Sequence, residues 1–589
     1  IDKDQYDMTG RLVRSSTLEK NTNVSAEPTA ANTHTVQSLE IGYDSYDRVD
    51  SFVQSLEGAK TKTGFVYGDA AKAQRPGLSY GLTVDGVTRQ TLEYDALSRR
   101  TKEVVTLSGG SKRENLYVFG TINHLTDTDS LLGSMSNGTD SWNYTYDNAG
   151  NITAITSGEK RISYQYDELN QLIRENNGVL NETILYTYDA GGNMTSRKTY
   201  DYTEGTLQTI KKNETFTYRS DGWKDQILSW NGYRYTYDAG GNPTLLRGVP
   251  LTWGEGRRLK KVSLSWGTVD FAYDSDGKRV RKTSGGNTTT YYYNGNVLSG
   301  LVKRAAGSTG AGTTVQFVYD TQGKPFMLRL NGKTDYFYLY NGLGDVVGLV
   351  DSSNQVVVRY QYNSWGKVTS TQDTSGVSLA TLNPFRYRKY VYDPETGLYC
   401  LGSRYYDPEV GRFVNADDTD VIFAKPQELY HKNLYVYCDN NPVVRRDLQG
   451  YFWETLFDIV SLGTSVVEVC VNPGDPWNWA GLIGDAIDLI PFVTGAGEAT
   501  RAVKTANKVA DKTTAVIKIQ KAVDFTDESA KMVKSLDRSK GYTRSSLRAG
   551  IYIHNGYKAT SEFIKKKEVR LISKSRLDYV DKTRKIIYE

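Results

Sequence analysis

The first 380 residues or so alternate aromatic and aliphatic residues with polar ones, a period of two that predicts β-strands. In "YTYDNAGNI", for example, Tyr144 and Tyr146 flank a threonine. The Asp and Gly that follow such runs are turn formers, because Asp bonds its own backbone and Gly accepts a positive φ. A second alternating run follows the turn, so each unit predicts a β-hairpin of roughly twenty residues.

One phrase recurs along this region, with tyrosine, aspartate and a glycine or asparagine at fixed places. Its copies are "YDMTGRL", "YDALSRR", "YDNAGNI", "YDELNQL", "YDAGGNM", "YDAGGNP", "YDSDGKR" and the worn "YNSWGKV". One hairpin buries too little area to fold alone, so we expect the hairpins to add edge to edge in a long array. We also expect the Tyr ring of each hairpin to stack on that of the next. The repeated aspartates are interpreted as turn formers, not as catalytic carboxylates.

Composition supports an all-β repeat structure, since the 589 residues include 55 glycines and 44 tyrosines. Only 38% of the residues are hydrophobic, but tyrosine supplies additional apolar area for packing. Three cysteines show no repeated pairing pattern, so no disulfide framework is expected, and four scattered histidines argue against a histidine-built metal cluster. The chain starts at Ile1, inside a repeat, which suggests a piece of a longer polypeptide.

Charge is distributed unevenly. The whole chain has 72 Lys and Arg against 68 Asp and Glu, whereas residues 501–589 contain 22 against 10. A basic tail on a mildly acidic body favours a polyanionic partner for the tail alone. A solvated charged surface is the alternative explanation.

The sequence changes character after residue 383, where "PFRYRKYVYDPETGLYCLGSRYYDPEVGRFVNADD" is followed by "NLYVYCDNNPVVRRDLQG". The phrases "YDPETGLY" and "RYYDPEVGRF", together with the repeats, resemble the Rhs family of YD-repeat polymorphic toxins and its Rhs-associated core domain. The resemblance implies that residues 1–383 coil into a hollow β shell. It also implies that residues 384–451 plug one end of the shell and end in an aspartic self-cleavage site.

Such cleavage needs two neighbouring carboxylates, one acting as base on water and the other as acid. The family pattern places them at Asp417 and Asp447 and the scissile bond between Tyr451 and Phe452. Arg412 is expected beside the pair, as a cation that holds one carboxylate ionised.

The chain departs from the family pattern at three positions of this block. Asp418 and Leu448 stand where the family has proline, and Tyr451 stands where it has leucine. The segment "DVIFAKPQELYH" also lengthens the connection between the two aspartates. These departures leave open an inactive relic in which both aspartates are ordinary turn and strand-end residues.

Residues 452–545 contain the most apolar stretch, which predicts two short helices split by "NPGDP" and then an Ala- and Lys-rich helix. Acidic residues interrupt the apolar runs, so a membrane-spanning helix is not expected. The phrase "PFVTGAGEA" resembles the pre-toxin segment of polymorphic toxins. The segment either inserts into a target-cell membrane during delivery or forms a helical hairpin packed inside the shell.

Residues 546–589 end in "EVRLISKSRLDYVDKTRKIIYE", which predicts two strands joined by a turn at "DKTR". This end resembles the active hairpin of restriction-endonuclease-like toxins. The resemblance implies that Asp578 and Glu589 bind Mg²⁺ or a similar divalent cation. The family's lysine two residues beyond the glutamate is absent, so we expect a truncated, poor nuclease. An ordinary amphipathic hairpin is the alternative, and His554 is expected to be structural.

The expected fold is therefore mostly β, a hollow shell followed by an α-rich and then an α/β toxin region. The resemblance implies a secreted or surface-bound bacterial toxin used in interbacterial competition. The shell would enclose its own toxin domain, self-cleavage would release it, and the toxin would cut nucleic acid in the target-cell cytoplasm unless a cognate immunity protein blocks it. Two alternatives remain: a surface adhesion or scaffold protein without enzymatic cargo, and a membrane-active toxin acting through residues 455–495.

Overall fold

The computed structural model describes ten stretches of the chain, which are residues 2–8, 10–20, 33–46, 48–120, 131–308, 310–417, 433–447, 453–455, 579–581 and 586–588. The chain divides into two compact units. The larger unit contains the described residues as far as Thr455, and the smaller contains the short strands at 579–581 and 586–588.

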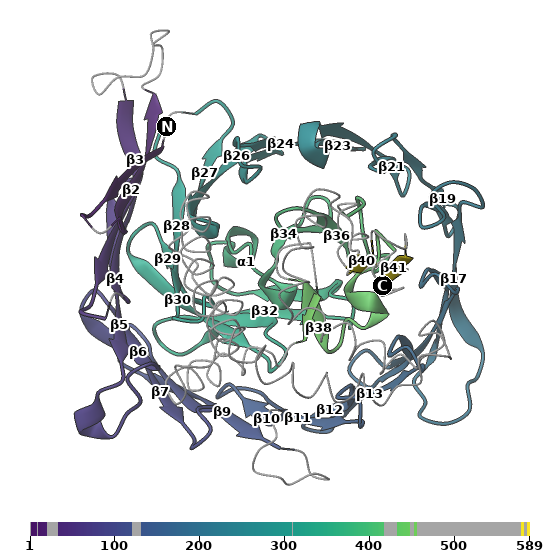
Figure 1. Ribbon diagram of the computed structural model, residues 1–589, viewed down its shortest axis with the longest axis horizontal. Helices are drawn as coiled ribbons and strands as arrows, with labels where there is room; N and C mark the ends of the chain where they lie inside the picture. The colour runs from purple at the N-terminus through teal and green to yellow at the C-terminus, as the bar shows by residue number, and fades with distance from the viewer. Residues whose placement is uncertain are drawn as a thin grey trace. The chain divides into compact units, whose positions relative to one another are not determined.

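The larger unit is built from antiparallel sheets in which each strand pairs with its neighbours in sequence (Figure 1). The first sheet contains β1 (Asp2–Tyr6), β2 (Leu12–Lys20), β3 (Thr33–Tyr43), β4 (Val49–Leu56), β5 (Ala59–Tyr67), β6 (Ser79–Val84), β7 (Val87–Tyr94), β8 (Arg100–Thr106), β9 (Lys112–Phe119), β10 (Leu132–Ser136), β11 (Ser141–Tyr146), β12 (Ile152–Ser157), β13 (Lys160–Tyr166), β14 (Leu172–Asn177), β15 (Glu182–Tyr188), β16 (Met194–Asp201), β17 (Ile210–Tyr218), β18 (Ile227–Trp230) and β19 (Tyr233–Arg234). This ladder confirms the predicted edge-to-edge array.

The second sheet continues the array directly. It contains β20 (Thr236–Tyr237), β21 (Pro243–Leu246), β22 (Val249–Gly254), β23 (Arg258–Leu264), β24 (Gly267–Tyr273), β25 (Arg279–Ser284), β26 (Asn287–Asn294), β27 (Val297–Ala305), β28 (Thr313–Tyr319), β29 (Pro325–Leu330), β30 (Thr334–Tyr340), β31 (Val346–Val350), β32 (Val356–Tyr362) and β33 (Val368–Asp373).

The smaller elements follow in the core block and at the turns. A four-stranded sheet contains β34 (Val391–Asp393), β35 (Leu398–Cys400), β36 (Tyr405–Asp407) and β37 (Arg412–Phe413), and β38 (Arg445–Asp447) pairs with β39 (Trp453–Thr455). The helical elements are α1 (Leu379–Leu382) and the 3₁₀ turns η1 (Ala70–Lys72), η2 (Glu255–Arg257), η3 (Tyr387–Lys389) and η5 (Cys438–Asn440). The predicted mostly β fold is confirmed. Within the described stretches, every helix is too short or too polar to cross a bilayer.

The turn aspartates act as the sequence predicts. Asp147 Oδ1 accepts hydrogen bonds from the backbone N–H of Ala149 and of Asn151, both at 2.9 Å. Gly150 adopts a φ of +80°, a value that a side chain would strain. The same geometry recurs at Asp167 and Asp189. The YD aspartates therefore close hairpins.

The repeat tyrosines link consecutive hairpins through their hydroxyl groups. Tyr166 Oη donates to the Ile152 carbonyl at 2.7 Å, and Tyr188 Oη donates to the Leu172 carbonyl at 2.7 Å. Equivalent bonds are made by Tyr43, Tyr67, Tyr94, Tyr146, Tyr218, Tyr273, Tyr293, Tyr319, Tyr340 and Tyr362.

The expected ring stacking is thus wrong for this part of the array. No ring contact joins Tyr166, Tyr188 and Tyr218 among the described residues. The physical reason lies in the backbone, because the strand register shifts at the tyrosine of each hairpin, as between Thr145 and Tyr146, opposite the Ile152 that accepts from Tyr166 of the next hairpin. Such a bulge disrupts the ladder locally, and a buried carbonyl without a partner is costly. The tyrosine hydroxyl supplies the missing donor.

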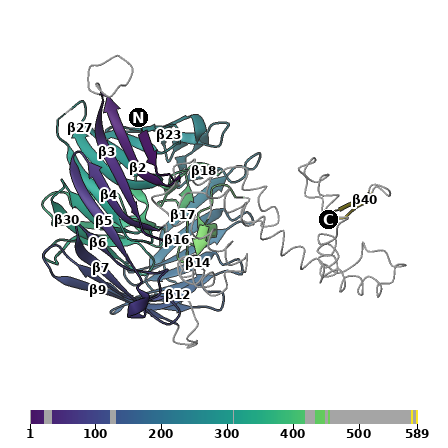
Figure 2. The same ribbon diagram turned by 60° about the vertical axis from the view of Figure 1, so that its left-hand side comes forward.

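Two parts of the array lie against each other as a double layer, with β3–β9 along β26–β32 (Figures 1 and 2). Gln37 Nε2 donates to Asn294 Oδ1 at 2.6 Å, and Gln54 Nε2 donates to the Ser299 carbonyl at 2.7 Å. Buried aliphatic and aromatic side chains, among them Leu39, Phe52, Val315 and Phe317, fill the same interface. The periodicity of the sequence did not predict this double layer.

Residues 384–417 and 433–447, here called the core segment, pack on the inner side of the array (Figure 1). Its buried tyrosines, Tyr387, Tyr399, Tyr406 and Tyr437, form one cluster with shell residues such as Tyr164 and Tyr186. The Tyr406 and Tyr437 ring centroids are 4.1 Å apart. An aromatic core therefore fixes this segment against strands β10–β24.

Candidate active site

Asp417 and Asp447 meet at a single guanidinium, that of Arg404. Arg404 Nη1 lies 2.9 Å from Asp417 Oδ2, and Arg404 Nη2 lies 3.1 Å from Asp447 Oδ2. All three residues are buried, with 5%, 7% and 2% of their surface exposed for Arg404, Asp417 and Asp447. The structure thus brings together the two carboxylates that the family pattern selected.

The Arg404 guanidinium packs against an aromatic ring. Its Cζ lies 3.5 Å from the centroid of the Phe413 ring, and Nη1 donates to the Leu434 carbonyl at 3.4 Å. Burial lowers the pKa of Arg404 below its ordinary value, against the opposite pull of the two carboxylates. Arginine keeps its proton even so. The site therefore contains a fixed positive charge between two acids.

The backbone around each aspartate is also fixed. The Asp417 N–H donates to the Leu434 carbonyl at 2.9 Å, and Arg257 Nη1 donates to the Asp417 carbonyl at 2.7 Å. The Asp447 N–H donates to Tyr390 Oη at 2.9 Å. Both carboxylates are therefore placed by main-chain bonds as well as by Arg404.

Arg412 does not neighbour this pair, and the expectation that it would is wrong. Its guanidinium donates to Asn193 Oδ1 at 3.0 Å and to the Asp225 carbonyl at 2.8 Å. The reason is strand geometry, because successive side chains of a strand point to opposite faces. In β37, Phe413 faces Arg404, so Arg412 faces the shell. The cation beside both carboxylates is Arg404 of the "RYYDP" phrase, and the sequence alone has no signal that distinguishes it from Arg412.

The turn before Asp447 is strained. Cys438, Asp439 and Asn440 adopt left-handed φ values of 51°, 49° and 59° in succession. Such a conformation costs roughly 1–2 kcal/mol for each residue other than glycine. An ion pair of 2.8 Å between Asp439 and Arg445 spans the turn. Strain of this kind persists only where surrounding contacts enforce it, and it is common at functional sites.

The strand that ends at Asp447 pairs with the next described strand. β38 and β39 are antiparallel, and their register places Asp447 opposite Trp453. The proposed scissile bond, Tyr451–Phe452, belongs to the short connection between these two strands and lies outside the described residues, as do Asp418 and Leu448. The chain thus passes Asp447 again directly after that connection.

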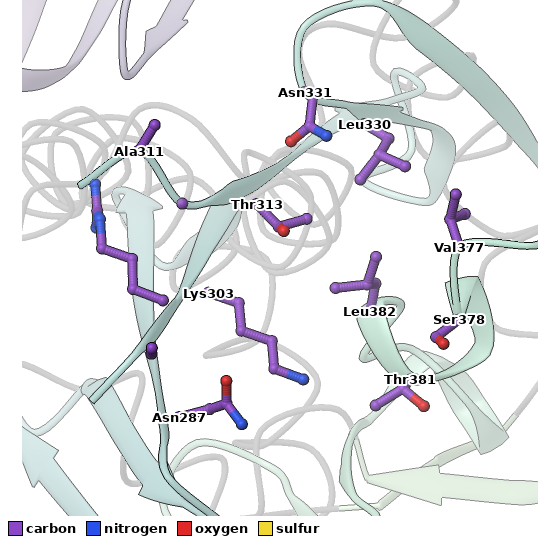
Figure 3. Close-up of a pocket in the computed structure, with 13 residues that line it drawn as sticks. Asn287, Lys303, Ala311, Thr313, Leu330, Asn331, Val377, Ser378, Thr381 and Leu382 are labelled. Carbon is purple, nitrogen blue, oxygen red and sulfur yellow. The ribbon is translucent and has the colours of Figure 1, made fainter. Parts of the chain in front are cut away.

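A cavity of about 510 Å³ lies elsewhere, between the ends of β26–β28 and the residues around α1 (Figure 3). Lys303, Thr313 and Leu382 line it, and none of Arg404, Asp417 and Asp447 does. The two aspartates are instead enclosed by protein. An enclosed pair of carboxylates suits a substrate that belongs to the same chain.

The smaller unit contains one described hairpin. β40 (Tyr579–Asp581) pairs antiparallel with β41 (Ile586–Tyr588), with Tyr579 opposite Tyr588. The predicted strand pair is therefore present, although Asp581 belongs to the strand and not to the turn. Asp578, Glu589 and His554 lie outside the described residues. Within the described stretches, no group of three or more His, Cys, Asp and Glu side chains is arranged to hold a metal ion.

The chain resembles several known proteins. The Teneurin YD-shell family matches residues 5–443. The tRNA3(Ser)-specific nuclease WapA of Bacillus spizizenii is 32% identical over 321 residues, covering 54% of this chain and 13% of that protein. The tRNA nuclease WapA of Bacillus subtilis strain 168 is 28% identical over 444 residues, covering 66% of this chain and 18% of that protein. The chain thus spans less than a fifth of the length of either relative.

Several solved structures share the fold. The crystal structure of TcdB2-TccC3-Cdc42 superposes with a TM-score of 0.59 at 19% identity, covering 78% of this chain and 24% of that one. At this identity the likeness concerns the fold alone. The match to the family, by contrast, covers the repeat array and nearly all of the core segment. This chain belongs to the Teneurin YD-shell family, and its YD repeats are of the kind found in Rhs-type toxins.

Proposed function

We propose that this chain is the shell and core portion of a bacterial polymorphic toxin that cuts itself between Tyr451 and Phe452. The observation that carries the proposal is the buried contact of Asp417 and Asp447 with one guanidinium, beside a strand pair that returns the chain past Asp447. Relatives named as tRNA nucleases support a toxic cargo behind such a shell. In this proposal the shell encloses residues 452–589 until cleavage.

The proposed cleavage divides two roles between the aspartates. One, kept ionised by Arg404, accepts a proton from water, and the water oxygen attacks the Tyr451 carbonyl carbon. The other, protonated, donates its proton to the Phe452 nitrogen as the C–N bond breaks. The products are a new carboxyl group at Tyr451 and a new amino group at Phe452. Arg404 supplies charge, and no group outside the chain except water is needed.

The proposed cargo is a nuclease. Its support is the basic character of residues 501–589, the β40–β41 hairpin and the nuclease names of the relatives. Asp578 and Glu589, which flank this hairpin in sequence, are the proposed ligands of Mg²⁺, an ion that prefers carboxylate oxygens. When bound, such an ion lowers the pKa of its water and offsets phosphate charge. The cargo would act in the cytoplasm of a target cell, with an immunity protein protecting the producer.

Mass spectrometry of the purified, folded protein tests self-cleavage. We expect two fragments that separate between Tyr451 and Phe452, and a single intact polypeptide for Asp447→Asn. Asp270→Asn is the control, because Asp270 is a partly exposed aspartate of β24 that pairs with Lys261 and lies outside the core segment. A parent protein that stays intact over days would refute self-cleavage. An intact protein whose tail is also inert would favour the adhesion or scaffold function.

The nuclease proposal needs a separate assay on the longest natural polypeptide that contains residues 452–589. We expect it to cut tRNA or DNA with Mg²⁺ and to lose that activity with EDTA or in Asp578→Ala. Leakage of dye from liposomes, without nucleic-acid cleavage, would instead favour a membrane-active tail.

A further inference from the structure

Three consecutive hairpin turns of the shell carry a carboxamide at the fifth position after the repeat tyrosine. These docking turns are Asp147–Asn151, Asp167–Gln171 and Asp189–Asn193. Other repeats carry a cation at that position, as at Arg11, Arg48 and Arg99. There the guanidinium bonds its own turn aspartate and lies over an aromatic ring, for example Arg48 over Tyr67 at 4.0 Å.

The turn aspartate fixes which way each carboxamide points. The side-chain nitrogens of Asn151, Gln171 and Asn193 donate to the aspartate of their own turn at 3.0, 3.1 and 3.1 Å. The amide oxygen is therefore left facing away from the turn, and it can only accept a hydrogen bond. The three docking turns thus present a row of acceptors.

The core segment supplies one donor for each acceptor. Asn441 Nδ2 donates to Asn151 Oδ1 at 2.9 Å, and Asn440 Nδ2 donates to Gln171 Oε1 at 2.8 Å. Asn433 Nδ2 donates to Asn193 Oδ1 at 2.9 Å.

The second N–H of each core asparagine is also used. It donates to a backbone carbonyl of a docking turn or its neighbour, namely that of Asn170, Gly192 or Gly191. The three core asparagines are at most 8% exposed, and the three carboxamide residues of the docking turns are at most 4% exposed. A shift of the segment by one residue would leave these buried groups unpaired, which disfavours other registers.

These bonds connect the shell to both aspartates. Asn433 precedes Leu434, whose carbonyl accepts from the Asp417 N–H and from Arg404. Asn441 opens the turn that leads into β38, and its carbonyl accepts from the Arg445 N–H at 3.3 Å. Asp447 ends that strand.

We infer that the docking turns recognise the core asparagines and thereby set the positions of Asp417 and Asp447. Asn151, Gln171 and Asn193 are then positioning residues for the proposed self-cleavage, on which this inference rests. The surface fits a segment that presents carboxamide donors at the spacing of "NLYVYCDNN".

Asn193 and Asn242 provide a matched pair for the test. Asn242 lies in the same motif and donates to Asp238, but its Oδ1 accepts no hydrogen bond from any described residue. We expect Asn193→Ala to slow cleavage between Tyr451 and Phe452 about tenfold, the scale of a lost buried hydrogen bond. Asn242→Ala should cleave at the parent rate.

Asn193→Asp separates recognition from mere stability of the turn. It keeps the acceptor oxygen that faces Asn433 and Arg412, but it places a second carboxylate beside Asp189. If Asn193 positions the core segment, Asn193→Asp should cleave faster than Asn193→Ala. If Asn193 only stabilises its turn, Asn193→Asp should be the slower of the two, and the inference is overturned.

Hydrogen–deuterium exchange of residues 433–447 keeps the inference testable even if the parent protein does not cleave. That outcome would refute self-cleavage alone. We then expect faster exchange in this segment for Asn193→Ala and unchanged exchange for Asn242→Ala. Equal exchange in the parent and both variants would show that the docking turns do not hold the core segment.

Discussion

At the scale of single residues, the chemistry of the core segment depends on which side chains share a face. Arg404 contacts both aspartates because Phe413, and not Arg412, faces it from the neighbouring strand. Likewise, the bulge at Tyr146 lies opposite Ile152, whose carbonyl accepts from the hydroxyl of Tyr166 in the next hairpin. One step along a strand decides the role of a residue in both cases.

Replacing Arg404 with lysine should impair self-cleavage without unfolding the core segment. A lysine has one charged nitrogen, so it cannot contact Asp417 and Asp447 through two separate nitrogens as the guanidinium does. We expect slower appearance of the two fragments by mass spectrometry, with an unchanged far-ultraviolet circular dichroism spectrum. Arg257→Lys is a milder comparison, since Arg257 donates to the backbone carbonyls of Ala416 and Asp417. Equal rates for Arg404→Lys and the parent would contradict this role.

Tyr166→Phe should destabilise the array by about 1–3 kcal/mol, because the Ile152 carbonyl loses its donor while it remains buried. A lower midpoint of thermal unfolding by circular dichroism would report the loss. Tyr233→Phe is the control, since Tyr233 is 54% exposed and should leave the midpoint unchanged.

Glu175 should make stability depend on pH. It is fully buried, and burial raises the pKa of its carboxyl above the ordinary 4.5 although Asn177 and Tyr186 donate to it. A raised carboxyl pKa favours the protonated form in the folded state. The contribution of the protonated Glu175 carboxyl to folding stability is complete below about pH 4.5. It is lost as the pH rises through the higher pKa that the carboxyl has in the folded state.

We therefore expect Glu175→Gln to raise the thermal midpoint relative to the parent at pH 8 but not at pH 4. The exposed Glu159→Gln should show no such difference. If Glu175→Gln raised the thermal midpoint equally at pH 8 and at pH 4, the result would argue against a buried titrating carboxyl at residue 175.

At the scale of elements, the sequence predicted the hairpins because their signals are local. Alternation, Asp and Gly act within a few residues, and "YDNAGNI" forms the turn it predicts, with Gly150 at positive φ. The bonds between elements were harder to predict. Ring stacking of the tyrosines assumed regular strands, whereas the bulge at Tyr146 lies opposite Ile152, whose carbonyl accepts from the Tyr166 hydroxyl. Arg412 was chosen over Arg404 because the parity of β37 cannot be known before its neighbours are.

The pairing of β38 with β39 gives a prediction at this scale. Proline at Glu454 cannot donate a backbone hydrogen bond and restricts the strand, so Glu454→Pro should loosen the return of the chain past Asp447. We expect little cleavage in Glu454→Pro and parent-like cleavage in Glu454→Ala, both followed by mass spectrometry. If both variants cleave equally well, the strand pair is not required.

At the scale of the whole larger unit, distant parts of the array are joined by buried charges that no local pattern reveals. Arg329 bonds Asp335 in its own hairpin at 2.7 Å and Asp85 across the double layer at 2.6 Å. Burial alone disfavours the charge of Arg329, but these bonds raise its pKa. Such contacts depend on the curvature of the array, which brings distant hairpins together. The periodicity of the hairpins does not specify that curvature.

Arg329→Met should therefore lower the thermal midpoint clearly, because it leaves Asp335 buried without its partner, a loss of about 3–5 kcal/mol. Lys211→Met removes an exposed pair with Asp201 and should change the midpoint little, because such pairs are screened by solvent. Similar midpoints for the two variants would mean that the double layer does not depend on Arg329.

The bond from each repeat tyrosine to the hairpin before it has a consequence for how such arrays lengthen during evolution. Each hairpin carries one acceptor carbonyl and one donor hydroxyl, as Leu172 accepts from Tyr188 in the same way that Ile152 accepts from Tyr166. A copied hairpin therefore finds an acceptor in the hairpin before it and offers one to the hairpin after it. Viable insertions and deletions should therefore comprise whole hairpins, and the lengths of related arrays should differ by whole repeats.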